Sequence, residues 1–383
     1  MRFIERFQKL KILFSYEREV NLDDTSLKIR PFQFNQVFVD PAVRLFQQTI
    51  SPPEFCSVSD DNIKENNLFT YTVFVHKGVV QADKAILLLH GLNERSWEKY
   101  LPWAEKLAVG TGRPVILFPI AFHMNRTPES WHNPRSLLPY VNRRKEKFAS
   151  LGNSTFANLA ISSRLSENPA RFYISGKESI FNLWQLIREI KNGQHPLFAP
   201  NTSINIFAYS IGAFLAQVLL LSNPEKLTSD SRLFMFCGGS LFSRMDGNSR
   251  DIVDWEAFLK LKDYFLNDFV HKGLSILKKK EDFIEKAFKS MLSFSKYRHY
   301  RETFFQENQN RIAAITLKKD TVIPTLGVKE AFGEKCADKI VEELDFPYEY
   351  SHQVPFPVHS RVPSEMVQQC FAQIFDRAIV FLA

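Results

Sequence analysis

The feature of this sequence that most constrains its fold is a series of short, largely apolar runs separated by segments with helical spacing. Three of these runs occupy residues 84–89, 204–208 and 312–317. A short apolar run without polar alternation is typical of a parallel strand that helices cover on both faces. Strands that alternate with helices in this way predict an α/β fold with a doubly wound, mostly parallel sheet.

The other elements follow from the same patterns. β-Branched and aromatic residues predict an outer strand at 68–79, and further strands are expected at 114–118, 233–237 and about 339–350. Helical spacing predicts helices at 97–109, 180–190 and 211–221 and a closing helix from Pro363. Residues 121–170 are rich in Asn, Pro, Arg and Ser, and they predict a long irregular segment of the functional or flexible kind.

Length and composition fit one large globular chain with insertions. The 383 residues are 45% hydrophobic, which is ample material for a core. We expect residues 1–65 to be an N-terminal extension that packs on the core. Residues 66–240 and 306–383 are expected to form an α/β core, and residues 241–305 a helical cap inserted over the strand ends.

Composition also bears on partners and location. The formal charge is +7, and basic residues crowd 278–301, but no nucleic-acid-binding motif accompanies them. No signal-peptide pattern or membrane-spanning run occurs, and the four scattered cysteines are expected to be reduced thiols. We therefore predict a cytoplasmic protein.

One segment of the expected cap has an amphipathic pattern. Ile284, Phe288 and Met291 form an apolar stripe beside Lys286 and Lys289. Packing of the stripe on the core is the favoured interpretation. Contact with a membrane surface is the alternative.

Ser210 lies where the strand 204–208 meets the helix that begins at Ile211. In the sequence AYSIG at 208–212, small residues stand two positions before and after the serine. This pattern is typical of a nucleophile elbow, a tight turn that exposes the serine hydroxyl above the sheet. The start of the helix directs free N–H groups at the same point, so the Ile211 amide is the expected first oxyanion-hole donor.

With this elbow the chain resembles the α/β-hydrolase superfamily of esterases, lipases and peptidases, from residue 84 to the C-terminus. The chain departs from the Gly-x-Ser-x-Gly pattern only by an alanine at the first small position. His90-Gly91-Leu92 matches the oxyanion loop of the superfamily, which implies that the Leu92 amide is the second oxyanion-hole donor and that His90 holds the loop. Asp320 follows the strand 312–317 and matches the acid loop, which implies that it orients the catalytic histidine.

Two histidines are candidates for the catalytic base. His352 and His359 both fall between the last predicted strand and the closing helix, where the superfamily places this residue. His352 comes two residues after Tyr350, the predicted end of the strand, whereas His359 lies close to Pro363. We favour His352, with His359 as the alternative base.

These residues predict a serine hydrolase that cleaves an ester or related acyl bond of a small-molecule acyl substrate through an acyl-enzyme. Amide or peptide hydrolysis with the same triad is one alternative, and a catalytically silent, hydrolase-like binding protein is another. No cofactor is expected, and no spacing of His, Cys and carboxylates indicates a metal site. The sequence does not fix the oligomeric state.

Residues near the expected pocket are candidates for substrate binding. His123 and Asn125 lie with His132 in the irregular segment that borders it, and Tyr209 adjoins the nucleophile. A structural, hydrogen-bonded role is the alternative for the histidines and the asparagine. The runs 90–97 and 118–126 resemble a bacterial branch of the superfamily, which implies no particular substrate.

Overall fold

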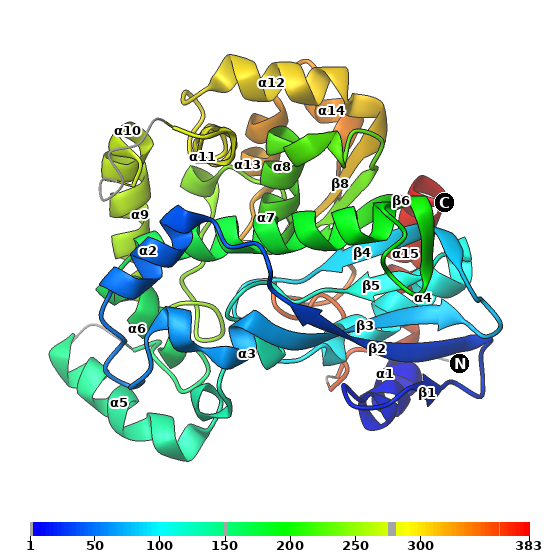
Figure 1. Ribbon diagram of the computed structural model, residues 1–383, viewed down its shortest axis with the longest axis horizontal. Helices are drawn as coiled ribbons and strands as arrows, with labels where there is room; N and C mark the ends of the chain where they lie inside the picture. The colour runs from blue at the N-terminus through cyan, green and yellow to red at the C-terminus, as the bar shows by residue number, and fades with distance from the viewer. Residues whose placement is uncertain (1–2, 149–151, 275–280, 360) are drawn as a thin grey trace.

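The computed structural model describes residues 3–148, 152–274, 281–359 and 361–383, and its centre is one mixed β-sheet (Figure 1). Within these ranges the sheet has nine strands in the order β1-β2-β3-β5-β4-β6-β7-β8-β9. The six strands β5, β4, β6, β7, β8 and β9 run parallel to one another, and β1, β2 and β3 pair antiparallel. The predicted mostly parallel α/β sheet is therefore confirmed. The strands are β1 (Val20–Asn21), β2 (Leu27–Asn35), β3 (Leu68–His76), β4 (Ala82–Leu89), β5 (Val115–Leu117), β6 (Phe198–Tyr209), β7 (Leu233–Phe236), β8 (Ile312–Leu317) and β9 (Val341–Leu344).

Helices cover both faces of the sheet, as a doubly wound fold requires. One face packs against α2, α7 and α8, and the other packs against α1, α4 and α15. In Figure 1 the long green helix α7 crosses in front of the sheet, and α15 lies behind it. The helices are α1 (Phe3–Leu13), α2 (Pro41–Thr49), α3 (Lys64–Asn67), α4 (Leu101–Thr111), α5 (Pro134–Lys147), α6 (Leu159–Glu167), α7 (Ala170–Lys191), α8 (Ile211–Ser222), α9 (Trp255–Asp263), α10 (Val270–Lys272), α11 (Phe283–Ser290), α12 (Arg298–Glu307), α13 (Thr325–Phe332), α14 (Ala337–Ile340) and α15 (Ser364–Leu382).

The N-terminal segment takes part in the sheet. β2 pairs along its whole length with β3, from Leu27 opposite His76 to Asn35 opposite Leu68. The segment also contributes α2, which begins at Asp40, whose side chain accepts hydrogen bonds from the amides of Ala42 and Val43. Residues 1–65 thus supply strands as well as a helical cover.

The segment 121–170, predicted to be irregular, contains the helices α5 and α6. Their buried faces are partly polar, which explains why hydrophobic periodicity did not reveal them. Arg144 of α5 lies 2.6 Å from Asp254 through its Nε. Arg164 of α6 lies 2.6 Å from Asp60 through its Nη1. Such ion pairs replace the apolar stripe that identifies a helix in a sequence.

Helices dominate residues 241–305, and they pack onto the core. α11 lies against α8, and α9 lies against α6. Ile284, Phe288 and Met291 are all buried in the main hydrophobic cluster, while Lys289 binds Glu281 and Glu285. The stripe at 284–291 therefore faces protein. Lys278, Lys279 and Lys280 lie outside the described residues, and among the described helices none is long and apolar enough to cross a bilayer.

Candidate active site

The candidate catalytic residues follow the carboxyl ends of neighbouring parallel strands. Leu89 at the end of β4 pairs with Ala208 near the end of β6, and the loop that starts at His90 therefore lies beside Ser210. Asp320 follows β8, two places from β6 in the sheet. In open α/β sheets this edge is where ligands bind.

The backbone at Ser210 has the strained geometry of a nucleophile elbow. Its φ of 54° and ψ of −122° are rarely adopted by a residue with a side chain. A Cβ atom on Gly212 would lie 2.7 Å from the carbonyl oxygen of His90, and one on Gly238 would lie 2.9 Å from the carbonyl oxygen of Ser210. Both positions therefore require glycine, and sequence reasoning identified only the first.

Ser210, His352 and Asp320 form a chain of hydrogen bonds. Ser210 Oγ lies 2.7 Å from His352 Nε2, and His352 Nδ1 lies 2.7 Å from Asp320 Oδ2. The other carboxylate oxygen of Asp320 accepts hydrogen bonds of 2.9 Å from the amides of Val322 and Ile323. All three side chains are buried. In this geometry the histidine can take the serine proton while the carboxylate holds its ring.

His352 reaches Ser210 from a longer loop than predicted. β9 ends at Leu344, not at about Tyr350, so His352 lies well inside the loop. The Tyr209 hydroxyl donates a hydrogen bond to the His352 carbonyl oxygen, which fixes this loop above the elbow. Tyr209 is buried and thus supports the histidine, whereas His359 is exposed and is not hydrogen-bonded to Ser210 or Asp320.

Two backbone amides beside Ser210 have no acceptor among the described residues. They belong to Leu92 and Ile211, the residues expected to form the oxyanion hole. A Cβ on Gly91 would lie 3.4 Å from Ser210 Cβ, so the loop 90–92 packs directly on the elbow. Free N–H groups at this position can bind a developing oxyanion.

The His90 side chain stabilises the loop 90–92 through hydrogen bonds of both ring nitrogens. Its Nδ1 lies 2.8 Å from the Gly91 carbonyl oxygen, and its Nε2 accepts a 2.9 Å hydrogen bond from the Ile120 amide. Complete burial and the nearby His123 lower the pKa of His90 well below 6.5. A neutral ring that donates on one side and accepts on the other suits a structural role.

Sequence reasoning missed a second support of the loop. The Gly91 amide donates to the Tyr100 hydroxyl at 2.9 Å, and that hydroxyl donates to Glu94 Oε1 at 2.7 Å. Lys99 binds the same Glu94 oxygen and also donates to the Gln353 carbonyl oxygen at 3.3 Å. These polar side chains in the segment before α4 therefore connect the loop 90–92 to the His352 loop.

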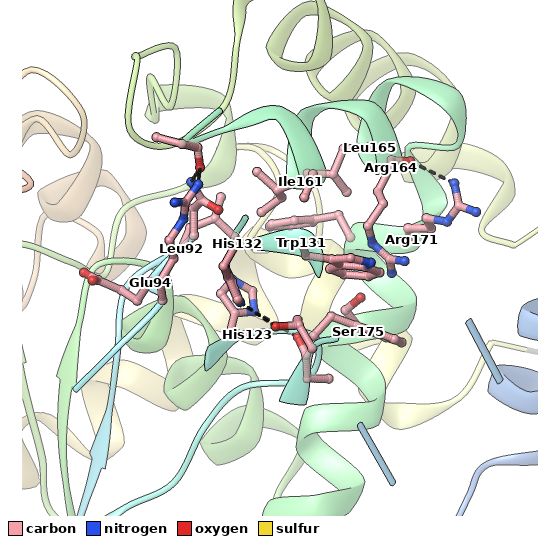
Figure 2. A pocket seen from close by; sticks show the side chains of 18 residues that line it. Leu92, Glu94, His123, Trp131, His132, Ile161, Arg164, Leu165, Arg171 and Ser175 are labelled. Atoms are coloured by element: carbon pink, nitrogen blue, oxygen red, sulfur yellow. Dashed lines mark hydrogen bonds between the residues drawn. The ribbon is translucent and has the colours of Figure 1, made fainter. Parts of the chain in front are cut away.

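Two cavities lie next to Leu92 and His123. The first is almost entirely apolar and is lined by α7, α8 and α11, including Ile211. The second is more polar and is shown in Figure 2. Each has a free volume of about 60 Å³. Ser210 is only 6% exposed and lines neither cavity, whereas its neighbours Leu92 and Ile211 line the apolar one.

The remaining candidates for substrate binding are placed differently. His123 lines both cavities, whereas Asn125 lines neither of them and donates to the Thr70 carbonyl oxygen at 2.8 Å. Cys237 is buried near Asp320, and burial raises its thiol pKa well above 9. Within the described ranges, no three His, Cys, Asp or Glu side chains are grouped to hold a metal ion.

The sheet order, the elbow after β6 and the loops after β8 and β9 together make this an α/β-hydrolase fold. A family model described as a family of unknown function (DUF6051) matches residues 1–383, which is the whole chain. The chain belongs to the DUF6051 family. No curated protein matches this DUF6051 sequence.

Several solved esterase structures resemble the DUF6051 chain at low identity. Carboxyl esterase 2 of the mycorrhizal fungus Tuber melanosporum is 10% identical, with a TM-score of 0.44 over 97% of both chains. A bacterial heroin esterase is 11% identical, with a TM-score of 0.47 over 99% of this chain and 91% of its own. An esterase from the archaeon Pyrobaculum calidifontis is 11% identical, with a TM-score of 0.40 over 98% and 90%. Similarity at this level does not extend to the substrate.

Proposed function

We propose that this protein is a serine hydrolase that cleaves esters of short-chain carboxylic acids, with Ser210 as the nucleophile. The observation that carries the proposal is the pair of 2.7 Å contacts from Ser210 to His352 and from His352 to Asp320. The strained φ of 54° at Ser210 and the free amides beside it add independent support, because strain and unpaired donors cluster at reactive sites.

In the proposed reaction, Ser210 Oγ attacks the ester carbonyl carbon while its proton passes to His352 Nε2. Asp320 stabilises the resulting imidazolium, and the Leu92 and Ile211 amides stabilise the oxyanion. His352 then gives the proton to the leaving alkoxide, which departs as the alcohol. A water molecule, deprotonated by His352, hydrolyses the acyl-Ser210 ester and restores the free enzyme.

The apolar cavity supports a short acyl group. Its lining includes Ile211, Phe214 and Leu215 of α8, so it begins at the oxyanion-hole residues and follows that helix. Its free volume is about 60 Å³. An apolar cavity of roughly 150 Å³ holds a benzene molecule, so this one suits an acyl group of about two to four carbon atoms.

Labelling with a fluorophosphonate tests the nucleophile. Wild-type protein and a Ser222→Ala control, changed at the far end of α8, should react, and Ser210→Ala should not. Labelling that persists in Ser210→Ala, or that is absent from folded wild-type protein, contradicts the proposal.

A panel of p-nitrophenyl esters from acetate to decanoate, together with aminoacyl amides, tests the bond and the chain length. We expect kcat/KM to be highest between acetate and butyrate and to fall for longer chains. Turnover of amides in preference to all esters would instead assign an amidase.

A further inference from the structure

The second cavity contains polar atoms that the proposed chemistry does not use. His123 Nε2, His132 Nδ1 and Trp131 Nε1 are buried, have no hydrogen-bond partner and belong to side chains that line this cavity. Figure 2 shows these three side chains around it. Buried polar groups are nearly always paired, so unpaired atoms on three side chains that line one cavity point to a ligand.

The partners of the two histidines fix which atoms can accept. His123 Nδ1 lies 2.9 Å from the Ala121 carbonyl oxygen, which can only accept, so Nδ1 carries the proton. His132 Nε2 lies 2.7 Å from the Thr127 hydroxyl, whose own proton goes to the Met124 carbonyl oxygen at 2.8 Å. His132 therefore donates through Nε2. The free atoms, His123 Nε2 and His132 Nδ1, are both acceptors in the neutral rings.

The charges around the cavity restrict the ligand further. Arg164 and Arg171 share the single carboxylate of Asp60, with contacts of 2.6 Å and 3.1 Å. Arg95 also lines the cavity, and the carboxylate of Glu94, which lines it too, is bound to Lys99. The surroundings are therefore positive and disfavour an ammonium group. Burial and nearby arginines lower the pKa of both His123 and His132, which keeps them neutral near pH 7.

An anionic group is disfavoured for a different reason. The lone pairs of His123 and His132 would face the oxygens of a ligand carboxylate, and neither imidazole ring supplies a free N–H to bind them. Neutral O–H groups satisfy both acceptors, and a hydroxyl oxygen can accept from the Trp131 N–H. The cavity therefore matches a small neutral group with two or more hydroxyls.

The cavity adjoins the proposed site through Leu92, whose amide is an expected oxyanion-hole donor. Glu94 lines it, and Lys99 joins Glu94 to the carbonyl oxygen of Gln353, next to His352. His352 is the residue that returns a proton to the leaving oxygen. We propose that the polar cavity binds the alcohol part of the ester and selects small alcohols with free hydroxyls, such as glycerol, an inference that rests on the proposed function.

Matched acetate esters test this selection in the wild-type protein. Glyceryl monoacetate and propyl acetate share a three-carbon alcohol skeleton and differ in two hydroxyls. We expect kcat/KM to be about tenfold higher for the glyceryl ester, mainly through KM, since two neutral hydrogen bonds are gained. Equal values for the two esters overturn the inference and leave the proposed function intact. Absence of both hydrolysis and fluorophosphonate labelling overturns both.

Variants then assign the preference to the two histidines. His123→Leu and His132→Leu should each lower the ratio of the two kcat/KM values by roughly 3- to 10-fold. His123→Gln and His132→Asn keep an acceptor near the lost nitrogen and should recover part of the ratio. The exposed His299→Leu serves as the control and should leave it unchanged. An unchanged ratio in both leucine variants overturns the assignment.

Charged alcohols provide the last comparison. Acetylcholine carries a cation, and O-acetyl lactate carries a carboxylate in the alcohol part. Both should be poorer substrates than glyceryl monoacetate. Preference for either one overturns the neutral-hydroxyl assignment.

Discussion

Replacement of Asp320 by asparagine tests the role of the carboxylate with little change in shape. One oxygen of Asp320 accepts 2.9 Å hydrogen bonds from the amides of Val322 and Ile323. These two donors require an acceptor, so the asparagine oxygen should take this position. Its NH2 group must then face His352 Nδ1. Two donors cannot bond, so the histidine proton should move from Nδ1 to Nε2.

The size of the effect follows from this change of tautomer. With a proton on Nε2, His352 cannot accept the proton of Ser210 across their 2.7 Å contact. In Ser-His-Asp enzymes the same replacement lowers kcat by about 10⁴-fold. That factor corresponds to about 5 kcal/mol of lost transition-state stabilisation. The free energy of unfolding should fall by only about 1–3 kcal/mol, because the two amide contacts remain.

The assay combines turnover with stability. Hydrolysis of p-nitrophenyl acetate and the rate of fluorophosphonate labelling are measured at pH 7, and urea denaturation reports the fold. Asp338→Asn is the control, because Asp338 is 85% exposed in its pairing with Lys329, and it should behave as wild type. A folded Asp320→Asn protein with kcat within tenfold of wild type would refute the proposed orientation of His352.

Three further predictions test the support of the site. Tyr209→Phe removes the hydrogen bond to the His352 carbonyl oxygen and should lower kcat roughly 10- to 100-fold with KM nearly constant. An unchanged kcat on p-nitrophenyl acetate would exclude this positioning role. Gly212→Ala places a methyl group 2.7 Å from the His90 carbonyl oxygen and should cost about 1–3 kcal/mol in urea denaturation, so wild-type stability would contradict the close packing. Burial lowers the pKa of His123 from 6.5 to about 4. As the pH falls, His123 is therefore protonated in the unfolded chain before it is protonated in the folded protein. The stability that is present above pH 6.5 is lost as the pH falls toward 4. The free energy of unfolding should fall by about 2 kcal/mol at pH 5 because of His123. The difference between the unfolding free energies at pH 7 and pH 5, measured by urea denaturation, should therefore be smaller in His123→Gln than in the wild type. An equal difference in the two proteins would show that His123 takes up a proton in the folded state as readily as in the unfolded chain.

The fold could be predicted because its strands are short, apolar and separated by helices. Ser210 and Asp320 could be named for a related reason. Each lies within a few residues of a strand end, so its place in the sequence also gives its place at the sheet edge. The structure brings His352 within hydrogen-bond distance of both residues.

The choice of His352 used a strand end that was wrong. Phe346, Tyr348 and Tyr350 alternate with Pro347 and Glu349, which imitates the period of a strand. In the structure these rings form an aromatic cluster with centroid distances of 5.3 to 6.3 Å. Phe356 extends the cluster at 5.7 Å from Phe346. The rings thus anchor the loop that carries His352 and do not extend β9.

The polar cavity could not be predicted, because its walls depend on contacts between distant segments. Arg164 packs over the rings of Phe122 and Trp131 at 4.4 and 4.7 Å, and Asp60 of the N-terminal segment holds it there together with Arg171. Without Asp60, two buried guanidinium groups would lose their shared counter-charge, which is a strongly destabilising change. The N-terminal segment therefore helps to shape the cavity that we assign to the alcohol, although no motif near Asp60 indicates a binding site.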